Sequence, residues 1–215
     1  MTYRELINQV LIRLREDTIT SDWSGAINDS STVSAYHKVI GALINDSKRS
    51  VESYHDWLNL RETVSISTVS GTKNYNLSSG QEIKIVDAIN ADTGIHLSQV
   101  SKVYLNTIKY PTDDTGEPLY YGFNGSDSSN NLKVDLSPIP TGVQTVNFEI
   151  IKHQDALTTA ATVLKVPSQP VILGAWARAI AERGEDGGTQ SSLAAIEAAE
   201  ALKQSVILDS GNTQY

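Results

Sequence analysis

The middle third of this chain is strand-like, whereas both of its ends are helical. Residues 116–121 (GEPLYY) lead, after a polar gap, into residues 132–140 (LKVDLSPIP), and both stretches have the composition of strands bounded by turn residues. A β region between two helical regions restricts the fold to the α+β class. No catalytic motif accompanies this order of elements, which is therefore more typical of a structural building block than of an enzyme.

Helical periodicity marks the first and last quarters of the chain. Residues 3–16 place apolar side chains at three- and four-residue spacing, and a second helical pattern continues over residues 33–58. At 1.5 Å per residue, this second helix would be about 40 Å long. Two further helices are predicted over residues 170–183, which are rich in alanine, and over residues 190–208. The polar tail 209–215 is expected to be disordered in isolation.

The period changes to two near residue 62, where strands begin. The strand candidates are residues 64–68, 75–77, 83–90, 95–97, 119–123, 132–136 and 143–151. Residues 101–110 fit a short helix as well as a strand, and residues 124–131, which contain no apolar side chain, are expected to form a mobile tip. We therefore expect an α+β protein: residues 1–61 and 156–215 form a helical domain, and residues 62–155 form an inserted, mainly antiparallel β domain.

The charge balance argues against tight binding of nucleic acid. The 215 residues carry 17 Lys and Arg against 25 Asp and Glu, a formal net charge of −8, without a basic cluster that would neutralise phosphates. The chain has no cysteine, which excludes disulfides and thiolate metal sites. Its start lacks the pattern of a signal peptide, and no apolar run approaches the roughly 20 residues of a membrane span. We expect a soluble protein from a reducing compartment, without a membrane partner.

The titratable residues form no recognised catalytic or metal-binding pattern. The four histidines are His37, His55, His96 and His153. None has a second histidine four residues away, the spacing of a helical metal site. Glu52 and Asp56 form a carboxylate pair at that spacing on the second predicted helix, and two carboxylates are the minimum for glycoside hydrolysis, although such pairs are also frequent on solvated helices. We predict no cofactor and no metal.

Two short motifs and the order of the elements resemble a known family. A Gly-x-Pro-x-x-Tyr stretch is present at Gly116, Pro118 and Tyr121, and an alternating strand ends in Pro-x-Pro at Pro138 and Pro140. A short helix, a turn and a long helix precede these motifs, and a helix pair follows them. Over nearly the whole chain, this order resembles the head-to-tail adaptors of short-tailed bacteriophages, the tubular tail protein A-like family. The serine- and asparagine-rich gap before the Pro-x-Pro strand departs from the family pattern.

The resemblance implies a structural virion protein without catalytic residues or a cofactor. Such an adaptor forms a homo-oligomeric ring, a dodecamer, between the portal protein and the tail nozzle, and tail fibres are further partners. DNA passes through an axial channel without specific binding during ejection. The implied location is the head-to-tail interface of the virion, after assembly in the host cytoplasm.

Candidate contact residues can be grouped by the partner that this role implies. The ring interface is expected at Tyr36, Ile40, Leu43, Ala177 and Ile180. The channel is expected to be lined by Glu182, Glu185 and Asp186, since acidic side chains do not hold a polyanion. The portal contacts are Asp209, Asn212 and Tyr215. The contacts with nozzle or fibres are Asp113, Asp114, Asn124 and Asp127.

The sequence leaves three other functions open. One is a head- or tail-completion protein of a long-tailed phage, which has a related role. A second is a virion-associated glycan hydrolase that uses Glu52 or Asp56, and a third is a cellular binding module with a β recognition face. Size in solution would separate a ring from a monomer, and peptidoglycan release by a Glu52 variant would test the enzyme.

Overall fold

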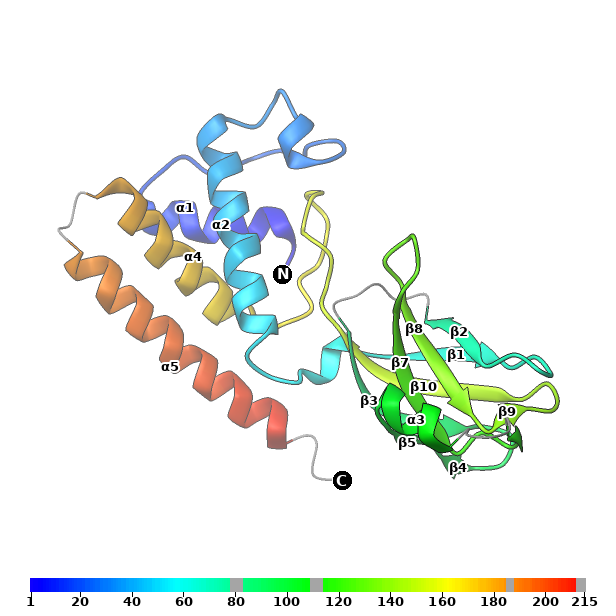
Figure 1. Cartoon of the computed structure of the whole chain (residues 1–215). Helices are drawn as coiled ribbons and strands as arrows, with labels where there is room; N and C mark the ends of the chain where they lie inside the picture. Colours follow the sequence, from blue (N-terminus) through cyan, green and yellow to red (C-terminus); the bar gives the residue numbers. More distant parts are fainter. Residues whose placement is uncertain (78–82, 109–113, 185–187, 212–215) are drawn as a thin grey trace. The chain divides into compact units, whose positions relative to one another are not determined.

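The chain forms two compact units, one helical and one built from β-strands (Figure 1). The computed structural model describes residues 1–77, 83–108, 114–184 and 188–211. Met1–Leu60 and His153–Tyr215 make the helical unit, and Arg61–Lys152 make the β unit. The expected α+β class, with helices from both ends of the chain and a mainly antiparallel β region between them, is confirmed.

The first helix, α1 (Tyr3–Leu14), begins at a capping box. Glu5 N donates to Thr2 Oγ1 at 3.3 Å, and Thr2 N donates to Glu5 Oε2 at 2.8 Å. These bonds satisfy amides that have no partner within the helix. The helix ends at Arg15, which adopts the left-handed conformation with φ 58° and ψ 37°. Its predicted apolar stripe is fully buried at Leu6, Ile7, Val10 and Leu11.

The second helix, α2 (Ala35–Glu52), is shorter than its sequence pattern predicts. Its 18 residues span about 27 Å instead of about 40 Å. Beyond Glu52 the chain turns back, because the indole Nε1 of Trp57 donates to Val51 O at 2.8 Å and a 3-10 turn, η2, forms over Leu58–Leu60. The helical period after Glu52 therefore reflects side chains buried by this turn and not a continuing helix.

Helix α4 (Ser168–Arg183) lies at the centre of the helical unit and packs against α1, α2 and α5 (Thr189–Gly211) (Figure 1). Small side chains allow this close packing, as the alanine-rich sequence predicts. Ala175 and Ala179 are buried, and Gly174 lies against the Ser47 hydroxyl of α2 so closely that a Cβ would overlap with it. The distance between α2 and α4 therefore depends on the absence of a side chain at Gly174.

The loop between α1 and α2, which contains the 3-10 turn η1 (Ile27–Asp29), is held against the later part of the chain. Trp23 is 5% exposed, packs edge-on against Tyr3 and donates its indole N–H to Thr158 O at 3.1 Å. Asn8 pairs with the backbone of Ile19 through two hydrogen bonds. The loop is therefore ordered around a buried tryptophan.

The β unit consists of two four-stranded sheets and a small pair. The sheet orders are β1-β10-β3-β4 and β2-β8-β7-β5, and the pair is β6-β9. The strands are β1 (Arg61–Ser67), β2 (Asn74–Leu77), β3 (Ile83–Asn90), β4 (Ile95–His96), β5 (Ser98–Gln99), β6 (Thr115–Gly116), β7 (Tyr120–Ser126), β8 (Leu132–Ser137), β9 (Ile139–Pro140) and β10 (Thr145–Lys152). The pairings β5 with β7 and β6 with β9 are parallel, and the other described pairings are antiparallel.

One apolar core joins the two larger sheets of the β unit. Tyr121 of β7 and Phe148 of β10 meet edge-to-face with ring centroids 5.5 Å apart, and both are buried. Tyr120 is half-exposed, so adjacent tyrosines point to opposite faces as the strand period predicts. Residues 101–110 fitted a helix as well as a strand. They form a short helix, α3 (Lys102–Ile108), and residues 109–110 lie outside the described residues.

The close approach of α2 and α4 can be tested at Gly174. We expect Gly174→Ala to lower the free energy of unfolding by about 1–3 kcal/mol, because the new methyl group overlaps with the Ser47 hydroxyl. Adding Ser47→Ala removes the clash, and urea unfolding should then show the double variant to be at least as stable as Ser47→Ala alone. Equal destabilisation with and without the Ser47 hydroxyl would contradict this account.

Candidate functional site

Helix α5 is the most exposed element of the helical unit. All 23 of its residues are described, and Ala194 alone is buried. At about 100° per residue, the half-buried Ala198, Leu202 and Val206 follow Ala194 along one side, and this side packs on α4. The contact between the two helices thus uses a single face of α5.

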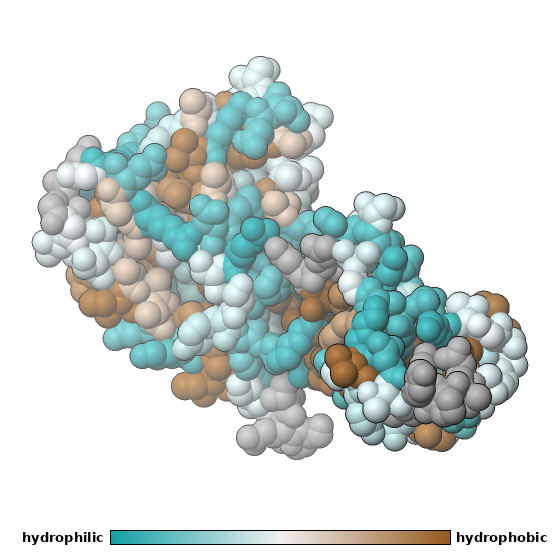
Figure 2. Space-filling model, in the orientation of Figure 1, coloured by the Kyte–Doolittle hydropathy of each residue, from teal (hydrophilic) through white to brown (hydrophobic). Residues whose placement is uncertain are grey.

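The opposite side of α5 carries four large apolar side chains that are exposed, together with the exposed polar residues Glu197, Glu200 and Gln204. The exposed fractions of the four apolar side chains are 59% for Leu193, 57% for Ile196, 70% for Ile207 and 74% for Leu208. These four lie within about 120° of one another around the helix. Figure 2 shows apolar surface along the course of α5. A helix with apolar residues on both sides is typical of a segment that is covered on both sides.

The end of α5 is fixed by Asp209. Its Oδ2 lies 3.2 Å from His55 Nε2 and accepts a hydrogen bond of 3.2 Å from Leu58 N. The imidazole of His55 packs edge-on against Trp57 at 5.0 Å between ring centroids. These contacts hold the last turn of α5, so the helix continues to Gly211, beyond the expected end at residue 208.

The residues predicted for a ring interface divide into two groups. Ile40 has no exposed surface, and Ala177 and Ile180 are each 8% exposed, so these three belong mainly to the chain's own core. Tyr36 and Leu43 are half-buried. The structure therefore leaves Tyr36 and Leu43 with surface for a neighbour, whereas Ile40 supports α2 from inside the unit.

The residues predicted for the channel and the portal are partly described. Glu182 is exposed on the last turn of α4. Glu185 and Asp186, and likewise Asn212 and Tyr215, lie outside the described residues. The sixth residue of these two groups, Asp209, makes the contacts that hold the last turn of α5.

At the tip of the β unit, Asp127 orders the turn between β7 and β8. Its carboxylate accepts hydrogen bonds from Ser129 N at 2.8 Å, from Asn131 N at 2.9 Å and from the Asn131 amide at 3.1 Å. These bonds lower the pKa of Asp127 below its usual value. The segment predicted to be a mobile tip is therefore built around a hydrogen-bonded turn, and its first three residues, 124–126, extend β7.

The other residues predicted to contact nozzle or fibres lie in the same unit. Asn124 donates from its amide to Asp135 Oδ1 at 2.9 Å and to Asn74 Oδ1 at 3.0 Å, which links three neighbouring strands. Asp114 is exposed, and Asp113 lies outside the described residues. Asp127 and Asn124 thus have structural contacts, and Asp114 projects from the surface.

The carboxylate pair considered for catalysis is separated by the end of α2. Glu52 is buried and forms an ion pair of 3.1 Å with Lys48, whose ammonium also donates to Gln154 O. Gln154 N donates to Glu52 Oε1 at 3.2 Å. Asp56 lies beyond the helix and is exposed. Glu52 therefore joins α2 to the segment that enters the C-terminal helices, and it does not share a helical face with Asp56.

Three histidines, His37, His55 and His96, each lie within bonding distance of one acidic or backbone group. His96 Nδ1 lies 2.9 Å from Asp87 Oδ2, and His37 Nε2 lies 3.2 Å from Asp17 O. Within the described ranges, no group of three or more His, Asp or Glu is placed to hold a metal ion. In the same ranges, no helix is both long enough and apolar enough to cross a membrane.

Sequence reasoning missed the outward side of α5. The five residues predicted for the ring interface all lie on α2 and α4, whereas Leu193 and Ile196 are exposed and Ala194, Ala198 and Leu202 form the packed side of α5. The signal was present in the composition, because apolar residues occur around the whole circumference of this helix and no side is consistently polar.

The described residues define an α+β protein, and its helix α5 exposes large apolar side chains of the kind that proteins cover on assembly. The sequence pattern of the SU10 adaptor protein family matches residues 1–214, and the chain belongs to this family. It is a family of phage head-to-tail adaptors, which confirms the resemblance seen in the motifs. The protein is accordingly a structural phage adaptor and a virion component of the head-tail junction. Among curated proteins, none matches the chain.

The structural role of Glu52 can be tested against a catalytic one. We expect Glu52→Ala to lower the free energy of unfolding by about 3–5 kcal/mol, because it leaves the buried ammonium of Lys48 without its carboxylate. The double variant Lys48→Met with Glu52→Leu should recover at least half of this loss in urea unfolding. The control is Asp46→Ala, which removes an exposed carboxylate from the same helix and should unfold like the parent protein. A Glu52→Ala protein with unchanged stability would contradict the assignment.

Proposed function

We propose that this protein is a head-to-tail adaptor that forms a ring between the portal protein and the tail nozzle. The ring is a dodecamer with an axial channel through which DNA passes. The observation that carries the proposal is the outward apolar side of α5, in a chain that belongs to a family of phage adaptors. Large exposed apolar surfaces of this kind are typical of protein–protein contacts.

In the proposed ring, α5 of one copy packs against its neighbour. Leu193 and Ile196 near the start of the helix, and Ile207 and Leu208 near its end, provide two apolar contacts. Each side chain that becomes covered would contribute about 1–2 kcal/mol per interface. Tyr36 and Leu43 are proposed as additional contacts, since they retain exposed surface, and Ile40, Ala177 and Ile180 hold α2 and α4 in position beneath it.

The charge of the chain fits a conduit for DNA. A net charge of −8 does not attract phosphates, and a wall without clustered cations lets a polyanion slide. We propose that Glu182, Glu185 and Asp186 face the channel. Assembly in the host cytoplasm would place the ring on the portal before the nozzle and the tail fibres join it.

The two ends of the adaptor are proposed to meet different partners. Asn212 and Tyr215 contact the portal, and a tyrosine ring buries much area at low entropic cost. Asp209 contributes indirectly, because its contacts with His55 and Leu58 fix the last turn of α5. Asp113, Asp114, Asn124 and Asp127 of the β unit are proposed to face the nozzle or the fibres.

The ring interface can be tested by placing charge on the outward side of α5. We expect Leu193→Asp with Ile196→Asp to prevent ring formation, while circular dichroism stays unchanged because both side chains are exposed in the single chain. The control is Val143→Asp in the β unit, where the side chain is 77% exposed. Light scattering after gel filtration and negative-stain images, with and without portal protein, give the readout. Rings that persist in the α5 variant would refute the interface.

The portal contact can be separated from the end of α5 by a deletion after Gly211. This deletion keeps Asp209 and its two contacts, whereas a deletion after Leu208 would also release the helix. We expect co-sedimentation with portal protein to be lost and ring formation to be preserved. Undiminished portal binding by the shortened chain would show that Asn212 and Tyr215 have no such role.

A further inference from the structure

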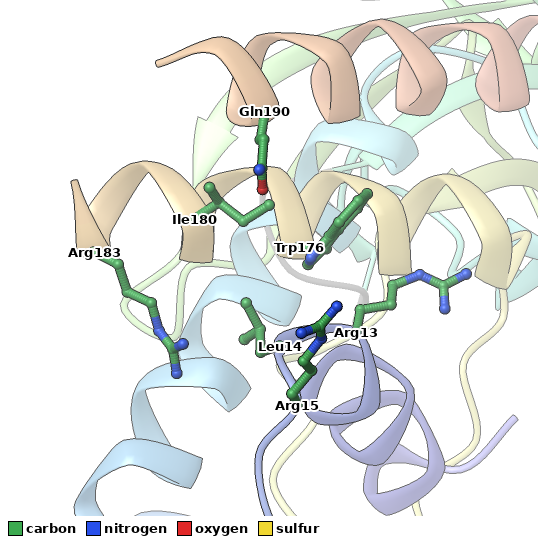
Figure 3. Close-up of a pocket in the computed structure, with 7 residues that line it drawn as sticks. All are labelled: Arg13, Leu14, Arg15, Trp176, Ile180, Arg183 and Gln190. Carbon is green, nitrogen blue, oxygen red and sulfur yellow. The ribbon is translucent and has the colours of Figure 1, made fainter. Parts of the chain in front are cut away.

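A cavity of about 540 Å³ opens in the helical unit, where α1 and α4 both end (Figure 3). Three arginines surround it: Arg13 and Arg15 from the end of α1, and Arg183 from the end of α4. Apolar walls come from Leu14, Trp176 and Ile180, and Gln190 extends from the first turn of α5. Figure 3 shows Arg15 directed towards Trp176, with Arg13 and Arg183 on either side.

The arginines differ in how they are held. Arg183 forms an ion pair with Glu16 and donates from Nε to the Tyr36 hydroxyl at 2.9 Å, and its guanidinium lies over the Tyr36 ring at 5.0 Å. Within the described part of the chain, neither Arg13 nor Arg15 forms an ion pair. Arg13 and Arg15 both line the cavity and thus have no ion-pair partner among the described residues, in a protein whose net charge is −8.

The helix dipole accounts for part of this arrangement, since cations are favoured at the end of a helix. It does not account for Arg15, whose φ of 58° is a conformation that glycine adopts without steric cost. Helix α4 ends in the same conformation with Gly184, at φ 66°. At the equivalent point of α1, the chain thus accepts a strained backbone to place a guanidinium beside Trp176.

The walls of the cavity decide between the anions that arginine recognises. A guanidinium binds carboxylate and phosphate equally well in geometry, through paired N–H donors. A duplex needs cations spaced along its backbone, and the rest of this acidic chain does not provide them. Leu14, Ile180 and the half-buried Trp176 instead offer surface to an apolar side chain. A peptide with an acidic residue next to a leucine or an aromatic residue would contact both the arginines and the apolar wall of the cavity.

We propose that this cavity binds an acidic peptide segment of a partner protein, with Arg13 and Arg15 on its carboxylates and an apolar side chain against Trp176. Arg183, held by Glu16 and Tyr36, fixes the third side of the cavity, and Gln190 is placed to bond the peptide backbone. The assignment of this partner to the head-to-tail assembly rests on the proposed function. The binding of an acidic peptide is independent of it.

The test is fluorescence anisotropy with the purified chain and a fluorescein-labelled peptide, Gly-Asp-Leu-Glu-Phe-Asp-Gly. Its amide counterpart, with Asn and Gln for Asp and Glu, and a labelled duplex DNA are the comparison ligands. We expect Arg13→Ala with Arg15→Ala to weaken peptide binding at least about tenfold, and added salt to weaken it further. The matched control is Arg178→Ala, on the same helix as Trp176, because Arg178 donates to Ser50 Oγ at 2.9 Å and does not line the cavity.

A second variant separates binding from folding. Arg15→Gly removes the guanidinium and the strain together, so it should melt at the parent temperature or above and still bind the peptide more weakly. Trp176→Ala should weaken binding of the peptide with phenylalanine more than that of the same peptide with alanine.

The proposal would be overturned if the parent and the double arginine variant bound the peptide equally, or if the amide peptide bound as tightly as the acidic one. Tighter binding of duplex DNA through the same arginines would also overturn it. If the variants changed only the size of the assembly, the occupant of the cavity would be a second copy of the chain and not a peptide. If the chain forms rings but does not bind the peptide, the peptide site is refuted and the proposed function stands. If the chain binds the peptide but forms no ring, the peptide site stands and the proposed ring is refuted.

Discussion

The helical unit depends on the packing of α4 against its neighbouring helices. This helix touches α1 and α2 from the start of the chain and α5 from its end, so it joins segments that are far apart in sequence. Gly174 lets α2 approach without a side chain between the helices, and the ion pair of Lys48 and Glu52 fixes the segment that leads into α4. An apolar helix in this position excludes water from the faces of α1, α2 and α5 that contact it, which stabilises the four helices together.

The position of α4 also determines which surfaces remain for other proteins. Because α5 has one neighbour, its side with Ala194 is covered and its side with Leu193 and Ile207 is exposed. Because α1 and α4 end close together, arginines from two helices surround one cavity next to α5. Both surfaces are thus products of the same packing arrangement.

Local sequence signals predicted the elements whose limits depend on nearby residues. The spacing of apolar side chains predicted α1 to start at residue 3, as it does, and strand β3 was predicted with its observed bounds, Ile83–Asn90. These signals fail where a distant or returning contact competes. Trp57 folds back onto Val51 and ends α2 early, and Asp209 bonds to the α2–β1 connection and extends α5. Neither partner can be recognised from spacing along the chain.

The sequence by itself determined the α+β class, the order of the elements, the acidic character and the adaptor family, because these depend on period, composition and motif order. The tertiary structure decided which apolar residues are buried in the core of the chain. It buried Ile40 on α2 and left Ile196 on α5 exposed. It also brought Arg13 and Arg183 to one cavity. Burial and clustering depend on which helix faces are covered by others, and that is a property of packing between distant segments.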